Sequence, residues 1–149
     1  MTLPVRIDFF KAVQTLLGAD STMKNLLTDP VVFYDTKAKN RAALPYIVMN
    51  ARLGQWDTVA TETGDGYGAE MNLDILIFTN SRGSSLNATI GQRIKELLRD
   101  TESLVMANHH LVMIRFMFEG NFDDQDDNAE TDQMLSYGVL QFRALIEEV

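Results

Sequence analysis

The stretch that decides the fold runs from Gly66 to Asp100 and reads GYGAEMNLDILIFTNSRGSSLNATIGQRIKELLRD. Its first half alternates with a period of two, as in a strand whose successive side chains point to opposite sheet faces. One face is wholly apolar and is formed by Met71, Leu73, Ile75 and Ile77. The other face begins polar and ends with Leu76 and Phe78, which predicts a central strand whose later part is covered on both sides.

A helix is predicted to follow this strand after a turn. Residues 79–83, TNSRG, suit a turn, and Ser84 or Ser85 can cap the helix by accepting a hydrogen bond from an amide of its first turn. The apolar residues beyond the cap fall on one side of the helix: Leu86, Ile90, Ile94, Leu97 and Leu98. We therefore expect the helix to lie on the sheet. No catalytic signature occurs in this stretch.

The N-terminal third of the chain begins with a predicted helix over residues 2–17. Thr2 is a candidate cap, Pro4 fits the first turn, and Gly18 can end the helix. Residues 19–27 add a short helical turn led by Asp20 or Ser21.

The remaining elements are four more predicted strands, over residues 31–34, 44–53, 109–118 and 133–146. The order α-β-β-β-α-β-β predicts an α+β fold in one domain, residues 1–149. We expect a mainly antiparallel, mixed sheet with two main helices packed on one face. Two polar connections, about 54–68 and 119–132, are expected to be mobile loops.

Composition and charge narrow the class of protein. The chain has 149 residues, 46% of them hydrophobic, which is enough for one buried core. It has no cysteine, so disulfides and thiolate metal sites are excluded. No apolar run approaches the roughly 20 residues that span a bilayer. We expect a soluble, intracellular protein without a membrane partner.

The net charge of −8 argues against a protein that grips nucleic acid, because phosphate binding requires a surplus of Lys and Arg on one face. The charges are unevenly distributed. Residues 119–132 hold seven acids and no base, whereas residues 37–41 hold three bases and no acid.

Two glycine-rich or acidic stretches resemble ligand-binding loops. Gly64, Gly66 and Gly68 precede a strand and no GKS or GKT follows, so a hairpin is favoured over a phosphate-binding loop. The acids between 124 and 132 alternate as in a calcium loop, but Ala129 stands where glycine is required and Leu135 where a glutamate is required. A solvated acidic loop is favoured, and we predict neither a cofactor nor a metal.

Other polar residues have simpler interpretations than catalysis. His109 and His110 are adjacent on a strand, so they point to opposite faces and cannot share a metal in the usual way. Asp74 could be a catalytic carboxylate, although a residue that faces solvent or a neighbouring subunit is favoured. Nothing brings an acid, a base and a nucleophile together, so no catalytic residue is assigned and the chain is not expected to be an enzyme.

The order of elements and several segments resemble the tail completion or tail terminator proteins of long-tailed phages and gene transfer particles. The resemblance spans nearly the whole chain and is carried by LLGADSTMKNLL, VVFYD, ALPYIVMN, MNLDILIFTN, LNATIGQRIKELL and YGVLQFRALIEE. The most characteristic pieces are Leu44-Pro45-Tyr46 and the central strand with its helix.

This resemblance implies a structural protein of the virion, assembled in the host cytoplasm. Such proteins form a ring, typically a hexamer, that stops polymerisation of the tail tube and joins the tail to the head connector. The implied partners are other copies of the chain, the major tail tube protein and a connector or stopper protein, while DNA passes through the ring without specific binding. Two alternatives remain: a head-closure or neck protein on the portal side, and a small enzyme or ligand-binding domain with a site near residues 54–68.

A closed ring needs two different complementary surfaces on each subunit. Charge points to the basic residues Lys37, Lys39 and Arg41 as one surface and to the acidic residues Asp123, Asp124, Asp126 and Asp127 as the other. They are expected to meet across subunits or to face successive partners. Trp56, in a polar loop, is a further interface candidate because a tryptophan gains most when it is buried against a partner.

Overall fold

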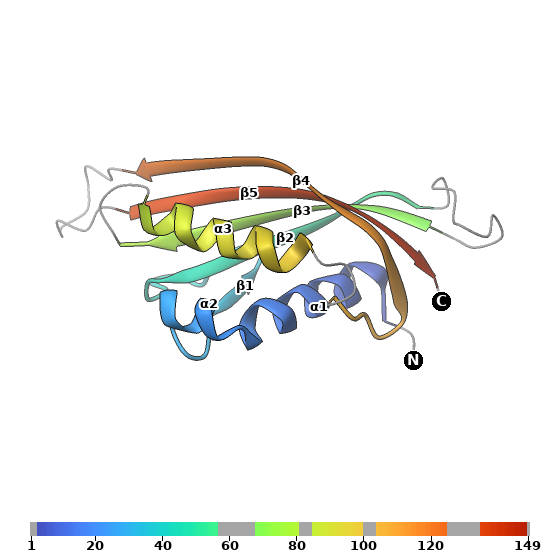
Figure 1. Ribbon diagram of the computed structural model, residues 1–149, viewed down its shortest axis with the longest axis horizontal. Helices are drawn as coiled ribbons and strands as arrows, with labels where there is room; N and C mark the ends of the chain where they lie inside the picture. The colour runs from blue at the N-terminus through green and yellow to red at the C-terminus, as the bar shows by residue number, and fades with distance from the viewer. Residues whose placement is uncertain (1–2, 57–67, 81–84, 100–103, 125–134, 149) are drawn as a thin grey trace.

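The computed structural model describes residues 3–56, 68–80, 85–99, 104–124 and 135–148 (Figure 1). Within these ranges the chain forms three helices and five strands: α1 (Val5–Ala19), α2 (Ser21–Leu26), β1 (Phe33–Asp35), β2 (Tyr46–Trp56), β3 (Gly68–Thr79), α3 (Ser85–Arg99), β4 (His109–Asp124) and β5 (Leu135–Glu148). None of the described helices is long and apolar enough to cross a membrane.

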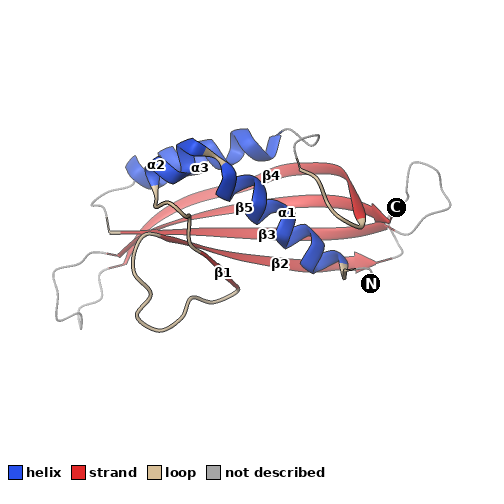
Figure 2. Cartoon of the chain, turned by 90° about the horizontal axis from the view of Figure 1, so that it is seen from below, coloured by secondary structure: helices blue, strands red, loops and turns tan. Residues whose placement is uncertain are grey.

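The strands form one mixed sheet in the order β1-β2-β3-β5-β4. Only β1 and β2 run parallel; the other neighbours are antiparallel. The described helices all lie on one face of this sheet, and none of them lies on the opposite face (Figure 2). This arrangement confirms the predicted α+β fold with a mixed sheet.

The core lies between the helices and the inward face of the central strand. Ile75 of β3 is paired with Met49 of β2 on one side and with Leu140 of β5 on the other, and all three side chains are buried. From the helical side Ile90 and Ile94 of α3 complete this contact without exposure to solvent. The predicted apolar face of the strand and the apolar side of the helix therefore meet.

The other face of β3 differs from the prediction. Leu76 and Phe78 are half-buried, but no second layer covers them. Instead, the Phe78 ring stacks on Tyr46 of β2 at 5.0 Å and on Tyr137 of β5 at 5.8 Å between ring centroids. The prediction of cover on both sides was wrong because neighbouring strands supply the contact that was attributed to a second layer.

Several predicted boundaries also move. Helix α1 starts after Pro4, which occupies the N-cap position without a side-chain hydrogen bond, and the predicted cap Thr2 lies outside the described residues. The helix continues through Gly18 to Ala19. The next helix is capped as predicted, because the Asp20 side chain accepts a hydrogen bond of 3.0 Å from the amide of Met23.

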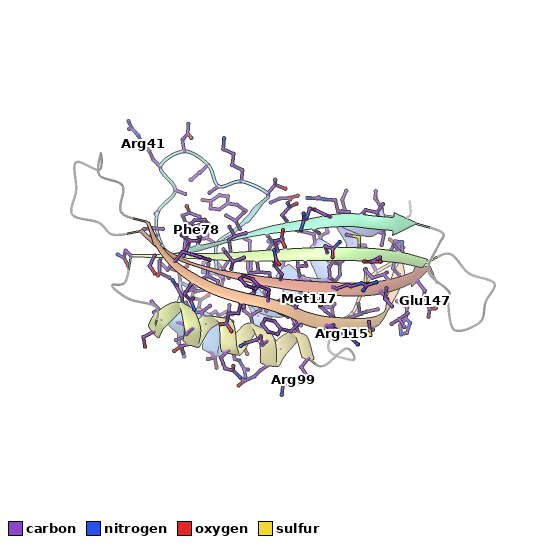
Figure 3. The ribbon with its side chains drawn as sticks, turned by 90° about the horizontal axis from the view of Figure 1, so that it is seen from above. Arg41, Phe78, Arg99, Arg115, Met117 and Glu147 are labelled. Carbon is purple, nitrogen blue, oxygen red and sulfur yellow. The ribbon has the colours of Figure 1, made fainter. Side chains whose placement is uncertain are left out.

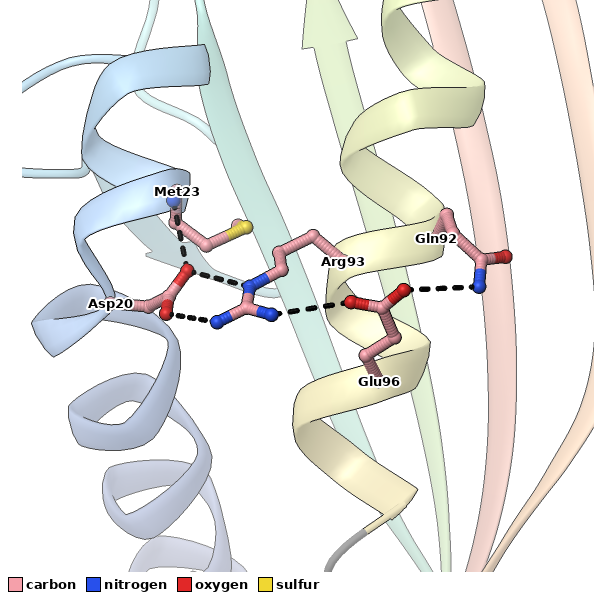
Figure 4. A network of polar contacts seen from close by, with 5 residues as sticks. All are labelled: Asp20, Met23, Gln92, Arg93 and Glu96. Atoms are coloured by element: carbon pink, nitrogen blue, oxygen red, sulfur yellow. Dashed lines mark hydrogen bonds and ion pairs between the residues drawn. The ribbon is translucent and has the colours of Figure 1, made fainter.

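The Asp20 carboxylate also joins α2 to α3 (Figure 4). Arg93 of α3 donates from Nε and Nη2 to the two oxygens of Asp20, at 3.0 and 2.7 Å, and from Nη1 to Glu96. The hydrogen bonds from Arg93 hold the pKa of the Asp20 carboxyl below its ordinary value, against the opposing effect of burial. Asp20 thus fixes the start of α2 and ties it to α3.

Helix α3 is also fixed at its beginning by a buried polar contact that the apolar pattern does not reveal. The Asn87 side chain accepts a hydrogen bond of 2.9 Å from Thr79 Oγ1 and donates one of 2.7 Å to Ser136 Oγ. Thr79 ends β3 and Ser136 lies at the start of β5. The amide of one residue therefore joins the helix to two strands.

Asp8 performs a similar function at the other end of the sheet. Its buried carboxylate accepts hydrogen bonds from the amides of Ala107 and Asn108, at 2.9 and 2.8 Å, and contacts His109 Nδ1 at 2.8 Å. Burial acts to raise the pKa of Asp8, but the hydrogen bonds from His109, Asn108 and Ala107 outweigh it and leave the pKa below its ordinary value. The segment that leads into β4 is thereby attached to α1.

Truncation of the core should destabilise the protein strongly. We expect Ile75→Ala and Ile94→Ala each to reduce the free energy of unfolding by about 2–5 kcal/mol, because each deletes buried methyl groups from close packing. Val105→Ala is the matched control, since Val105 is exposed. Urea unfolding followed by circular dichroism measures all three; equal losses for Val105 and Ile75 would contradict this description of the core.

The Asp8 contact should make stability depend on acid pH. A carboxyl with a lowered pKa stabilises the fold above its unfolded-state pKa, about 3.9, and this contribution is lost as the pH falls through the folded-state value. We expect Asp8→Asn to cost about 2 kcal/mol at pH 7 and to flatten the decline in stability below about pH 4. Chemical unfolding of both proteins across this pH range checks it; parallel pH profiles would show that Asp8 does not titrate as described.

Candidate functional site

The basic residues singled out from the sequence lie on a loop whose entry is anchored. Lys37, Lys39 and Arg41 are exposed, and no ion pair of these three occurs within the part of the chain that the structure describes. The loop starts after Asp35, which forms a two-point ion pair with Arg6 of α1 at 2.6 and 3.1 Å. We call residues 36–45 the basic loop.

Further contacts secure the same entry. Arg6 Nε donates a hydrogen bond of 2.8 Å to the carbonyl of Ala51 in β2, and the amide of Thr36 donates one of 2.8 Å to the carbonyl of Met49. Asp35 has a lowered pKa, first because of its hydrogen bonds with Arg6. The basic loop therefore projects from a fixed base at the β1 side of the sheet.

The acidic residues have a different setting from the one predicted. The sequence suggested a loop from residue 119, but β4 continues to Asp124, with Asp123 paired to Ser136 and Asp124 to Leu135. The prediction failed because Phe122 continues the strand by stacking on Tyr137 at 5.3 Å, a contact that the local charge pattern hides. Asp126 and Asp127 lie outside the described residues. We call Asp123 and Asp124, at the end of β4, the acidic tip.

The acidic tip and the basic loop lie on opposite edges of the sheet but at the same end. The strand order places β1 at one edge and β4 at the other. Tyr46 follows the basic loop directly and is paired with Phe78. Phe78 is paired with Tyr137, and Tyr137 is paired with Phe122 beside the acidic tip. One row of residues across the sheet thus runs from the basic loop to the acidic tip.

This row is aromatic in the four strands that it crosses, and an aromatic residue of β1 lies next to it. Tyr34 of β1 contacts Tyr46 edge-on at 5.4 Å, and the rings of Tyr46, Phe78, Tyr137 and Phe122 then stack in succession on the helix-free face. Figure 3 shows this face, with Phe78 in the sheet and the loop of Arg41 beside it. Stacked aromatic pairs contribute about 0.5–1.5 kcal/mol each beyond burial, so the row stiffens this end of the sheet from the face that none of the described helices covers.

The charged side chains elsewhere on this face compensate one another. Arg52 forms an ion pair with Asp74 at 2.9 Å, and Arg143 forms one with Glu70 at 2.9 Å. Asp74 therefore has a structural partner, and the interpretation as a residue facing solvent fits its position better than a catalytic role. His110 contacts Glu147 at 2.8 Å, whereas its neighbour His109 is buried against Asp8, so the two histidines are separated as predicted.

Strand β4 is the main apolar feature of the described surface. Four apolar side chains of this edge strand are between 42% and 54% exposed: Phe116, Met117, Phe118 and Phe122. The sequence predicted Phe116 and Phe118 on one face, but a bulge between them makes Phe116 pair with Phe142 and Phe118 with Gln141, which shifts the alternation. Phe118 consequently lies on the helix-free face.

A shallow groove of about 300 Å³ lies between this strand and the end of α3. Its floor includes Phe116 and Phe142, in edge contact at 5.7 Å, and Lys95 lies over the Phe116 ring. Lys95 is also paired with Glu119 at 2.6 Å. The groove therefore combines apolar and cationic groups, a chemistry suited to protein contact.

Trp56 is the last residue of β2, where it pairs with Ala69, and does not belong to a loop as predicted. This is the last backbone pair between β2 and β3. Residues 57–67, with Gly64 and Gly66 of the pattern considered as a phosphate-binding loop, are outside the described part of the chain, whereas Gly68 starts β3. Most of the acids of the calcium-like pattern are also outside it.

The described residues contain no cluster of three or more histidine or acidic side chains that could hold a metal. The apolar edge of β4 was not predicted from the sequence. The run Phe116-Met117-Phe118 indicates it, but the acidic residues that follow were selected as the interface instead.

Comparison with known proteins agrees with this architecture. The virion of a native gene transfer agent particle contains a chain of similar fold, with a TM-score of 0.66, 22% sequence identity, and coverage of 98% of this chain and 99% of that chain. No curated protein matches the chain in sequence. The family model described as tail completion protein gp17 matches residues 11–147, which include all five strands. The chain therefore belongs to the tail completion protein gp17 family, whose members have a structural role in tail assembly.

Proposed function

We propose that this protein is a tail terminator, a structural component of the virion that forms a ring on the end of the tail tube. The ring stops tube polymerisation and presents its other side to the head connector. Family membership supports the tail-assembly role. The ring, its partners and its position rest on the distribution of charged and apolar groups over the sheet.

The observation that carries the proposal is the placement of the basic loop and the acidic tip on opposite edges at one end of the sheet. Identical subunits in a closed ring make head-to-tail contacts, so each needs complementary groups on two different sides. Opposite charges on opposite edges meet this requirement. Contact within one chain is disfavoured, because four strand intervals of about 4.8 Å, roughly 19 Å, separate β1 from β4.

The charges also agree with passage of DNA through the ring without specific binding. The chain carries a net charge of −8, and Arg52 and Arg143 on the helix-free face are each paired with a carboxylate. Such arginines have little to offer to phosphates, whose tight binding needs uncompensated cations. The proposed neighbours are the tail tube protein on one side and a connector or stopper protein on the other.

Charge reversal of the basic loop tests the ring contact. We expect the triple variant Lys37→Glu, Lys39→Glu, Arg41→Glu to assemble at least tenfold more weakly at low salt, while the wild-type ring weakens as salt screens the contact. Light scattering against concentration and salt measures assembly, and capping of purified tail tubes measures function. Unchanged ring formation by the triple variant would contradict the proposed contact.

The reciprocal change supplies the control. The triple variant Asp123→Lys, Asp124→Lys, Asp126→Lys should by itself weaken ring assembly. When these changes are combined in one chain with the reversed basic loop, assembly should be restored. Restoration distinguishes an attraction between these groups from damage to the fold. A ring that binds portal complexes but does not cap tubes would instead support the head-closure alternative.

A further inference from the structure

We propose that the exposed apolar edge of β4 docks against the opposite edge of the next copy of this chain, where Ile7 and Leu53 form the receiving surface. The inference rests on the proposed ring and goes beyond it by naming the apolar surfaces that join its subunits. Its first support is the exposure of β4 itself. A long edge strand with exposed apolar side chains promotes association, and stable proteins usually protect such an edge.

The length of β4 is suited to a subunit contact. Its 16 residues extend over about 50 Å, and its outer side has no partner strand in the sheet. The bulge between Phe116 and Phe118 puts these two rings on opposite faces of β4, so apolar side chains are exposed on both faces of this edge strand. Exposed apolar groups of this kind need an apolar surface as their partner.

The opposite edge carries the matching apolar residues. Besides those of β4, the exposed large apolar side chains of the described residues are Ile7, Leu53 and Val105, at 39%, 48% and 78% exposure. Leu53 lies on β2 two residues after Ala51, beyond the three residues of β2 that β1 covers. Ile7 follows Arg6, whose Nε is bound to the Ala51 carbonyl. Leu53 and the start of α1, which carries Ile7, therefore lie close to Ala51.

The register of the sheet places these two apolar surfaces within two residues of the same height, because Leu53 is level with Ile114 through Met71 and Ala144. Phe116 pairs with Phe142, Phe142 with Leu73, and Leu73 with Ala51. The acidic tip and the basic loop are likewise level with each other through the aromatic row. Rotation about a ring axis that runs along the strands does not change the position of a residue along that axis. One edge-to-edge contact can therefore join the two apolar surfaces and also join the acidic tip to the basic loop.

Two like-charged pairs share a row in this arrangement. Glu119 stands level with Asp35 through Leu140, Ile75 and Met49, and the two carboxylates are neutralised within their own chains by Lys95 and Arg6. Arg115 stands level with Arg52, through Arg143 and Asn72. Arg52 is compensated by Asp74 at 2.9 Å, which reduces the repulsion. The contact therefore has an apolar centre. Opposite charges attract each other at one end, and the like charges are neutralised within their own chains, as expected for a protein interface with a polar rim.

Cross-linking tests this contact directly, because the chain has no cysteine to interfere. The double variant Leu53→Cys, Met117→Cys, treated with a short bis-maleimide under assembly conditions, should give a ladder of covalent oligomers in denaturing electrophoresis. Met117→Cys alone should give no covalent dimer, because a head-to-tail contact does not bring two copies of one residue together. A mixture of the two single variants should give dimers only.

Val105→Cys combined with Met117→Cys is the matched control, since Val105 is more exposed than Leu53 but belongs to the segment before β4 and not to either edge strand. A ladder from this control, or dimers from Met117→Cys alone, would overturn the proposed contact. If the double variant Leu53→Cys, Met117→Cys forms rings by light scattering but gives no covalent ladder, the proposed contact is overturned and the terminator function is left intact. Absence of any oligomer in wild-type protein would overturn both.

Discussion

The fold depends on the pairing of β3 along both of its sides. Strand β3 is paired with β5 from Gly68 to Thr79 and with β2 from Ala69 to Phe78, so inward side chains such as Leu73 and Ile75 are level with buried partners on each neighbouring strand. The row of Met49, Ile75 and Leu140 under α3 is one example. Because each buried group has two cross-strand neighbours and a helix above it, displacement of β3 would expose the core of the entire sheet.

Around this strand the structure uses a few polar side chains to place the remaining elements. Asp8, Asp20 and Asn87 each join segments that are distant in sequence, and the first two do so as ionised carboxylates with several donors. Buried charges of this kind are tolerated because their donors are arranged around them. The helix-free face is instead held by stacked rings and by paired charges.

The elements that the sequence predicts well are those whose signal is local. The alternation in β3 and the apolar side of α3 follow from spacing alone, and so does the capping of α2 by Asp20. The end of β4, the shift of Phe118 and the position of Trp56 depend on pairing with residues elsewhere in the chain, and no local pattern contains that information. The same reason explains why Lys37, Lys39 and Arg41 could be selected by charge, whereas their placement opposite the acidic tip required the sheet order.

The position of β5 has a consequence for synthesis of the protein. Strand β5 is formed by residues 135–148, yet in the sheet it lies between β3 and β4, which do not pair with each other. A nascent chain that ends before residue 135 therefore has no strand with which β4 can pair, and the apolar edge and the acidic tip lack the sheet that positions them. The order of strands thus delays the display of this edge until the whole sheet can close, so that incomplete chains do not offer a correctly formed surface to completed ones.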